Sequence, residues 1–245
     1  LARLAEDEGY DLALLRRLLR CAFQMSEANQ GAIFLLGDAE IAVEVKGASR
    51  VDSSDLRSLR AFIEAIPVHV IVVVDEAYFE YVHAKDHPDV SQWLGEYSNL
   101  IVTRTFSKAY GLAALRIGYG LSHPDVADLL NRVRQPFNVD SFAQAAALAA
   151  LDDRDYIQRS VAANDAGMRQ LVKGVERLGL DYIPSSGNFL AIDLGRDAGA
   201  VDQALLRLGV VTRPIANYGL PNHLRVSVGI GDENARFLAA LEQVL

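Results

Sequence analysis

The chain has 245 residues, 51% of them hydrophobic, and a formal net charge of −8. This length and composition indicate a globular protein with a substantial core, arranged as one large domain or as a large and a small one. The negative charge argues against nonspecific binding to nucleic acid or to an anionic membrane, so any anion site must be a local feature that suits a small anionic substrate. No apolar run approaches the ~20 residues of a transmembrane helix.

Cysteine use and the start of the chain bear on its location. Cys21 is the single cysteine, which excludes an internal disulfide framework and suits a reducing cytosol. No signal-peptide pattern is present, and we expect a cytoplasmic protein. Because the sequence begins with Leu1 rather than methionine, we also expect further chain upstream.

Helices and strands are predicted to alternate in the first half of the chain. The expected elements are a helix over residues 10–20 with Asp11 as N-cap, a buried strand over 32–36, a helix from Ser53 or Ser54 to Pro67, a buried strand ending at Asp75, a short helix over 88–97, and strands over 100–103 and 116–120. The strand, helix, strand order is that of a βαβ-type crossover, which predicts an α/β fold with a mainly parallel sheet.

The second half predicts a smaller α+β domain. A helix over residues 125–134 is expected before it. From there on the expected elements are helices over 141–151 and 152–178, a strand over 188–194, a helix over 201–208, a strand over 224–228 and a closing helix over 232–245. The alanine-rich helix over 141–151 is expected to be tightly packed. A break at residues 135–140 places the domain boundary near residue 135, giving domains 1–134 and 135–245.

Lys108 is the candidate reactive group. It follows a predicted strand and a turn that contains Thr105 and Ser107, in a mostly apolar setting where loss of solvation lowers the pKa of an amine. A neutral amine can attack a carbonyl. Arg116 follows eight residues later, and together with the two hydroxyls it predicts a phosphate site beside a Schiff-base lysine.

A second cluster lies upstream, where the apolar run from Val68 ends in Asp75-Glu-Ala-Tyr78. Ligands bind at the carboxyl ends of strands in open α/β sheets. Asp75 is therefore a candidate partner for the protonated pyridine nitrogen of pyridoxal phosphate, which such a carboxylate keeps electron-withdrawing. Glu76 points to the opposite side of the strand, so a solvated or cap-binding role is favoured for it.

These two clusters, with Arg116, resemble those of the fold-type I pyridoxal phosphate aminotransferases, and most closely the histidinol-phosphate aminotransferase group. The resemblance runs from about residue 51 to residue 245. It implies a three-layer αβα fold and a homodimer. It also implies that Lys108 forms the Schiff base with the cofactor, Asp75 pairs with the ring nitrogen, Tyr78 contacts the phenolic oxygen, and the phosphate is held by Thr105, Ser107 and Arg116. The implied substrates are glutamate and imidazole acetol phosphate, in histidine biosynthesis.

The sequence departs from the family pattern before residue 51. The family carries an Asn-Pro-x-Asn-Pro-Thr-Gly loop after the corresponding strand, and nothing between Leu36 and Val51 matches it. The family's first third also has no counterpart. A truncated, catalytically impaired relative is therefore an alternative to an active enzyme.

Arg213 and Arg225 are the candidate substrate-binding residues. Burying a guanidinium inside an apolar strand is costly without an anion, so a ligand contact is favoured for Arg225 over an internal salt bridge. The stretch around both residues resembles the family's carboxy-terminal signature, in which these arginines grip the substrate carboxylate or phosphate. Bidentate geometry favours arginine over lysine there.

Other functions were weighed against this one. A phosphothreonine decarboxylase or another amino-acid aminotransferase would share every site residue named above. A P-loop ATPase would need a Gly-x-x-x-x-Gly-Lys-Ser/Thr loop, which the sequence lacks. His83 and His87 have the spacing of two metal ligands, but Pro88 and the lack of a neighbouring third ligand favour a hydrated loop, and no metal site is predicted.

Overall fold

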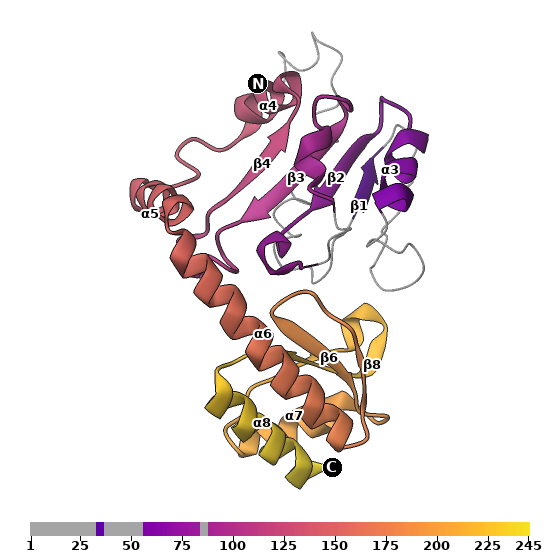
Figure 1. Cartoon of the computed structure of the whole chain (residues 1–245). Coiled ribbons are helices and arrows are strands. Elements are labelled where there is room, and N and C mark those ends of the chain that lie inside the picture. Colours follow the sequence, from indigo (N-terminus) through magenta and orange to yellow (C-terminus); the bar gives the residue numbers. More distant parts are fainter. Residues whose placement is uncertain (1–32, 37–55, 84–87) are drawn as a thin grey trace. The chain divides into compact units, whose positions relative to one another are not determined.

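The structure is a computed structural model that describes residues 33–36, 56–83 and 88–245 (Figure 1). The helix predicted over residues 10–20 and its cap Asp11, the caps Ser53 and Ser54, Cys21 and His87 lie outside the described residues. The chain divides into two compact units: Leu1–Phe79 with His83–Asp152, and Glu80–Val82 with Asp153–Leu245. The domain boundary near residue 135 stays a prediction.

The first unit is built on a four-stranded sheet of order β1-β2-β3-β4 (Figure 1). Its strands are β1 (Ile33–Leu36), β2 (Ile71–Asp75), β3 (Leu100–Thr105) and β4 (Gly118–Ser122). Only β2 and β3 are parallel, and the β1–β2 and β3–β4 pairs are antiparallel. The α/β class is confirmed, but a mainly parallel sheet and a βαβ crossover onto β2 were wrong for these strands.

Short connections explain the mixed sheet and the shorter elements. The segment between β3 and β4 holds only one turn of 3-10 helix, η3 (Ala113–Leu115), so the chain returns antiparallel instead of crossing over. Strand β2 begins at Ile71 because Val70 N donates to Pro67 O (2.9 Å) and closes a turn. Among the residues that the structure describes, the other helical elements of this unit are α3 (Leu56–Ala65), η1 (Phe79–Tyr81, which straddles both units), η2 (Val90–Trp93, in place of the longer helix predicted there), α4 (Pro124–Val133) and α5 (Ser141–Asp152).

Alternating side chains give the first sheet two distinct faces. On one face Val72 and Val74 pack with Leu100 and Val102 of β3, and with α3 and η2. The opposite face carries Val73 and Ile101, which are also buried. Since side chains alternate along a strand, Asp75 belongs to the face of Val73, whereas the residue after it belongs to the face packed against α3.

Helix α5 differs from its prediction. Ala143 and Ala147 are buried, but Phe142 is 82% exposed and Leu148 68% exposed, so the helix is packed on one side only. The tight packing predicted for this helix is found on the side of Ala143 and Ala147. In the part of the chain that the structure describes, no helix is both long and apolar enough to cross a membrane.

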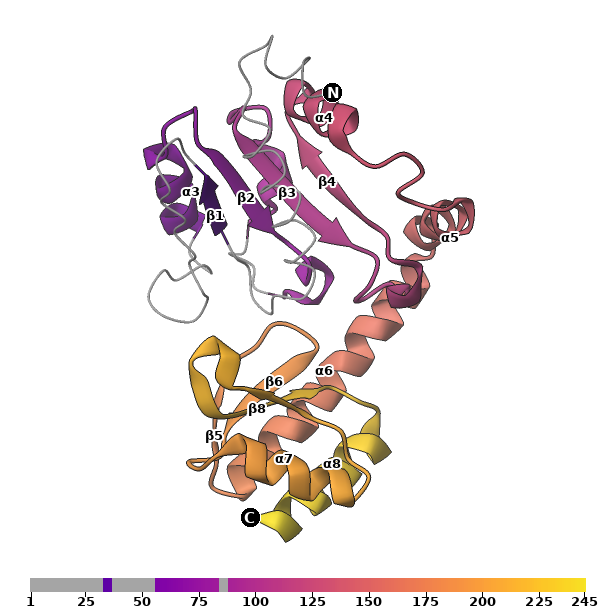
Figure 2. The same ribbon diagram turned by 180° about the vertical axis from the view of Figure 1, so that it is seen from behind.

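The second unit has an antiparallel sheet with helices on one face (Figure 2). Its elements are α6 (Arg154–Arg177), β5 (Asp181–Ile183), β6 (Phe189–Asp193), α7 (Ala198–Arg207), β7 (Arg213–Ile215), η4 (Ala216–Tyr218), β8 (Leu220–Ser227) and α8 (Gly231–Val244), with the strands ordered β5-β6-β8-β7. The α+β arrangement is confirmed, and β5 and β7 are additions to the predicted elements.

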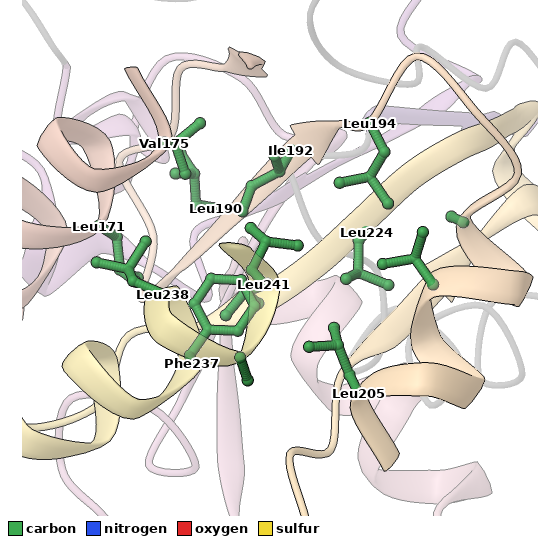
Figure 3. Packing of buried hydrophobic residues seen from close by; sticks show 14 residues of the cluster. Leu171, Val175, Leu190, Ile192, Leu194, Leu205, Leu224, Phe237, Leu238 and Leu241 are labelled. Atoms are coloured by element: carbon green, nitrogen blue, oxygen red, sulfur yellow. The ribbon is translucent and has the colours of Figure 1, made fainter. Parts of the chain in front are cut away.

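The core of this unit lies between the sheet and its three helices (Figure 3). Leu190 of β6 and Leu224 of β8 meet Leu205 of α7 and Leu241 of α8, and all four are fully buried. Gly174 lets α6 approach α8 closely, because a Cβ there would lie 2.4 Å from a Leu238 methyl carbon.

Candidate active site

Asp75 ends β2 and is held by two donors. Its Oδ1 accepts from the backbone N of Ala77 (3.0 Å) and from Oγ1 of Thr103 (3.3 Å), the residue opposite it in β3. Burial raises its pKa to about 6, although these hydrogen bonds and the charge of Lys108 act in the opposite direction. Near neutral pH Asp75 can therefore exist as a carboxylate that readily accepts a proton.

Lys108 sits in a tight loop after β3. The ring of Phe106 is buried against Tyr110 and Tyr119, and the carbonyl of Lys108 accepts from Gly111 N (2.9 Å). These contacts fix the backbone on both sides of Lys108, whose side chain is half-buried. Its Nζ lies 5.3 Å from the centre of the Tyr78 ring, within the range of a cation–π contact.

The predicted phosphate ligands lie on the same loop. Thr105 Oγ1 accepts from Ser107 N (3.0 Å), which makes a short turn at the end of β3. Arg116 is exposed and adopts φ of 50°, a left-handed conformation uncommon for a residue other than glycine, and its Nη1 donates to Ala113 O (3.0 Å).

Gly118 brings β4 against β3. A Cβ at this position would lie 2.8 Å from the carbonyl oxygen of Arg104, closer than real side chains approach. Only glycine therefore fits opposite Thr105, its partner in the strand pairing.

The prediction for Glu76 was half right. Its side chain lies on the face opposite Asp75, and its Oε1 accepts from the first backbone N–H of η2, Val90 N (3.1 Å), as a cap-binding acid would. However, Glu76 is only 6% exposed and its Oε2 accepts from Nε and Nη2 of Arg104 (2.9 and 2.7 Å). Sequence reasoning missed Arg104 and Thr103; an arginine in an apolar strand was the available signal for the first.

The second unit contains the two predicted substrate arginines. Arg213 of β7 and Arg225 of β8 are directly opposite each other in the strand pairing. The Arg225 guanidinium lies 4.3 Å from the centre of the Phe189 ring. Both arginines line a groove of about 600 Å³ whose other walls are the segment from Gly209 to Thr212 and the start of α8.

Like charges opposite each other on neighbouring strands are unfavourable, so this pair of arginines suits an anionic ligand. The structure thus groups Asp75, Tyr78, Thr105, Ser107 and Lys108, with Arg116 on the same loop, in the first unit. It groups Arg213 with Arg225 in the second. The roles assigned to these eight residues stay predictions.

Comparison with known proteins relates the chain to aminotransferases. A family model described as aminotransferase class I and II matches residues 50–241. Histidinol-phosphate aminotransferase 2 of Pseudomonas fluorescens Pf0-1 is 50% identical over 241 residues, covering 98% of this chain and 61% of the relative. The protein of the same name from strain Pf-5 is 61% identical over 187 residues, covering 76% and 50%.

Two solved structures share the fold. Histidinol-phosphate aminotransferase from Sinorhizobium meliloti, in complex with pyridoxal-5'-phosphate, has 34% identity and a TM-score of 0.71, over 77% of this chain and 52% of its own. A putative histidinol-phosphate aminotransferase from Erwinia carotovora has 29% identity and the same TM-score, over 77% and 55%. The chain spans about half the length of the curated relatives it matches. Since the family model covers most of its residues, the chain belongs to the class I and II aminotransferase family.

Proposed function

We propose that this chain carries the lysine-bearing part of a pyridoxal phosphate-dependent aminotransferase. The reaction would move an amino group from histidinol phosphate to 2-oxoglutarate, giving imidazole acetol phosphate and glutamate, or run in the reverse direction, as in histidine biosynthesis. The similar proteins named histidinol-phosphate aminotransferase support this choice. The grouping of Asp75, Tyr78 and Lys108 is the observation that carries it.

The residues at the end of β2 and β3 fit this cofactor chemically. They offer an acid, an amine, a phenol and two hydroxyls, which would partner a ring nitrogen, an aldehyde, a phenolic oxygen and a phosphate. When bound, pyridoxal phosphate supplies an electron-withdrawing ring that stabilises negative charge at the substrate α-carbon.

Asp75 would hold a proton between its carboxylate and the ring nitrogen. Its hydrogen bonds from Ala77 and Thr103 fix Oδ1, so the other carboxylate oxygen is the one available to a ligand. A carboxylate at this position keeps the ring nitrogen protonated, which a neutral side chain would not do.

Lys108 would act twice through Nζ. Its amine would hold the cofactor through the aldehyde carbon, and the free amine would move a proton to and from the substrate α-carbon. The packed loop around Phe106 fixes the backbone from which the Lys108 side chain extends. Thr105, Ser107 and Arg116 would bind the cofactor phosphate, the hydroxyls as donors and the guanidinium as counter-charge.

Arg213 and Arg225 would bind the anionic group of the substrate, its phosphate or carboxylate. Their opposed positions on β7 and β8 allow two guanidinium groups to share one anion.

We further propose that the protein works as a homodimer in the cytoplasm, and the exposed apolar side chains of Phe142 and Leu148 on α5 favour association. Sedimentation of the purified protein measures that state.

The proposed cofactor linkage is tested by reduction. We expect that pyridoxal phosphate followed by borohydride labels the chain once and that peptide mapping places the label on Lys108. Lys108→Ala should remove the label, whereas Lys173→Ala, which changes an exposed lysine of α6, should keep it. Labelling at other lysines with none at Lys108 would overturn the proposal.

The substrate is tested by turnover. We expect 2-oxoglutarate-dependent amino transfer from histidinol phosphate, with a loss of at least ~10²-fold in Lys108→Ala from the missing general base. Transfer from other amino acids alone would replace the substrate, and release of carbon dioxide from a phosphorylated amino acid would indicate a decarboxylase. A label at Lys108 without any turnover would indicate a catalytically impaired relative.

A further inference from the structure

A buried network of charges lies behind the candidate active site. The Arg104 side chain is 13% exposed and that of Glu76 3% exposed. Arg104 donates from Nε and Nη2 to Glu76 Oε2, and from Nη2 to Asp89 Oδ1 (2.6 Å). Its guanidinium carbon also lies 3.9 Å from the centre of the Phe79 ring.

The network and the site occupy opposite faces of the same two strand ends. Asp75 is opposite Thr103 in the parallel pairing of β2 with β3, and Glu76 N continues the pairing by donating to Thr103 O (2.9 Å). Because side chains alternate, Asp75, Thr103 and Thr105 share the site face, whereas Glu76 and Arg104 share the face covered by α3 and η2. The network therefore ties β2 to β3 at the residues next to those of the site.

Stability alone does not account for this arrangement. Well-packed apolar side chains commonly replace a buried ion pair without loss of stability, because desolvation offsets the attraction between the charges. Burial lowers the pKa of Arg104, but the contacts with Glu76 and Asp89 more than offset it, so the guanidinium stays charged. The network instead fixes two strands in one register and balances the charges of buried Glu76 and half-buried Asp89.

Glu76 also acts on Asp75 electrostatically. Among the residues that the structure describes, Lys108 favours the carboxylate form of Asp75 by its charge, and Glu76 disfavours it. Without Arg104, the Glu76 carboxylate would have no adjacent counter-charge on β3, and its negative charge would act on Asp75 unbalanced.

We propose that Arg104 is a positioning residue for Asp75: by pairing with Glu76 and Asp89 on the reverse face, it fixes the ends of β2 and β3 and shields Asp75 from the charge of Glu76. This proposal rests on the proposed function, in which Asp75 meets a ring nitrogen as a carboxylate. Arg104 itself belongs to the opposite face and touches no reacting atom.

The test follows the titration of Asp75 in cofactor-free protein by carbon NMR of labelled aspartate, with the signal assigned by its loss in Asp75→Asn. Arg104→Met removes the charge and keeps the aliphatic stem. We expect its Asp75 midpoint to rise by about one pH unit or more, the effect of an unbalanced like charge nearby. Arg104→Lys keeps a charge and should give a smaller rise.

The double variant Glu76→Gln/Arg104→Met separates charge from packing. It lacks both charges, so its midpoint should return toward that of the unmodified protein. Arg60→Met, which breaks exposed ion pairs of α3 in the same unit, is the control and should leave the midpoint unchanged. If Arg104→Met does not fold, Glu76→Gln alone should still lower the midpoint, because Gln keeps the hydrogen-bonding shape without the charge.

The outcome that overturns the inference is an Asp75 midpoint that is equal in the unmodified protein, Arg104→Met and Glu76→Gln. Cofactor affinity gives a second measurement: the dissociation constant for pyridoxal phosphate should rise in Arg104→Met and recover in the double variant. The NMR titration needs no cofactor, so this inference can fail while Lys108 is still labelled, and it can hold if Lys108 is not.

Discussion

The two units bury different chemistry. The core of the second unit is a cluster of fourteen apolar side chains between a sheet and three helices (Figure 3). In the first unit the apolar cluster of α3, β2 and β3 ends in charged groups: Glu76 and Arg104 on one face of the sheet and Asp75 on the other. The apolar core of the second unit stabilises its fold. In the first unit, burying charged groups lowers stability but keeps the candidate reactive groups in place.

The difference shows how a single sheet serves both purposes. Along β2 and β3 the apolar residues occupy the amino-terminal part of each strand and the charged ones lie toward the carboxyl end, where the chain leaves the sheet. Burying an acid without a close counter-charge raises its pKa and lowers the stability of the fold at neutral pH. Such a loss of stability is retained where the acid supports chemistry. If the comparison is right, substitutions in the two regions should change stability in opposite directions.

The largest expected effect is in the apolar core. Leu190→Ala in β6 removes a fully buried side chain in contact with the helices, so we expect unfolding free energy to fall by ~2–5 kcal/mol. Leu206→Ala on α7, where the side chain is 40% exposed, is the control and should change it by less than ~1 kcal/mol. Urea denaturation measures both, and equal losses would show that the cluster is not the stabilising core.

The substitution Asp75→Asn should raise the free energy of unfolding, opposite to the loss expected for Leu190→Ala. The folded-state pKa of about 6 lies above the ordinary aspartate value of 3.8, so the folded protein binds the proton more tightly and loses stability as pH rises through this interval. A pKa difference of about two units corresponds to a loss of ~3 kcal/mol in unfolding free energy, and this loss is complete above pH 6. Asparagine keeps an acceptor oxygen for Ala77 and Thr103 but carries no charge, so at pH 7 the variant should be more stable by up to that amount.

The pH profile distinguishes this effect from a change in packing. The advantage of Asp75→Asn in cofactor-free protein should shrink as pH falls from 6 toward 4, since Asp75 becomes protonated and neutral. Asp181→Asn, at an exposed position at the start of β5, should give no comparable profile. A variant that is less stable than the unmodified protein at every pH would contradict the burial cost assigned to Asp75.

Sequence reasoning predicted a candidate site at two strand ends because strand ends carry local signals. An apolar run ending in Asp75-Glu-Ala-Tyr78, and a second strand ending in a hydroxyl turn before Lys108, each predict where the chain leaves a sheet. Two adjacent parallel strands then place their ends together, and the β2–β3 pairing does so. The alternation of side chains also predicted that Glu76 points away from Asp75.

The directions of the strands and the partners of the buried charges could not be predicted from the sequence. The antiparallel course of β1 and β4 depends on where loops close, and β7 is a three-residue strand with a proline, which its composition argues against. The pairing of Glu76 with Arg104 depends on the register of two strands nearly thirty residues apart. A residue pattern read along one strand contains no information about that register.

The smallest expected effect comes from an exposed ion pair between an arginine and a glutamate, the same residue types as in the buried pair of Arg104 with Glu76. Arg177 of α6 donates to both carboxylate oxygens of Glu242 on α8, at 3.2 and 3.0 Å, but the two side chains are 59% and 52% exposed. Water solvates both charges when the pair is broken, so Arg177→Ala should cost less than ~1 kcal/mol, and salt should reduce that further. A double-mutant cycle with Glu242→Ala, followed by urea denaturation at low and high salt, measures the coupling. A coupling as large as that of Arg104 with Glu76 would show that geometry, rather than burial, decides what an ion pair contributes here.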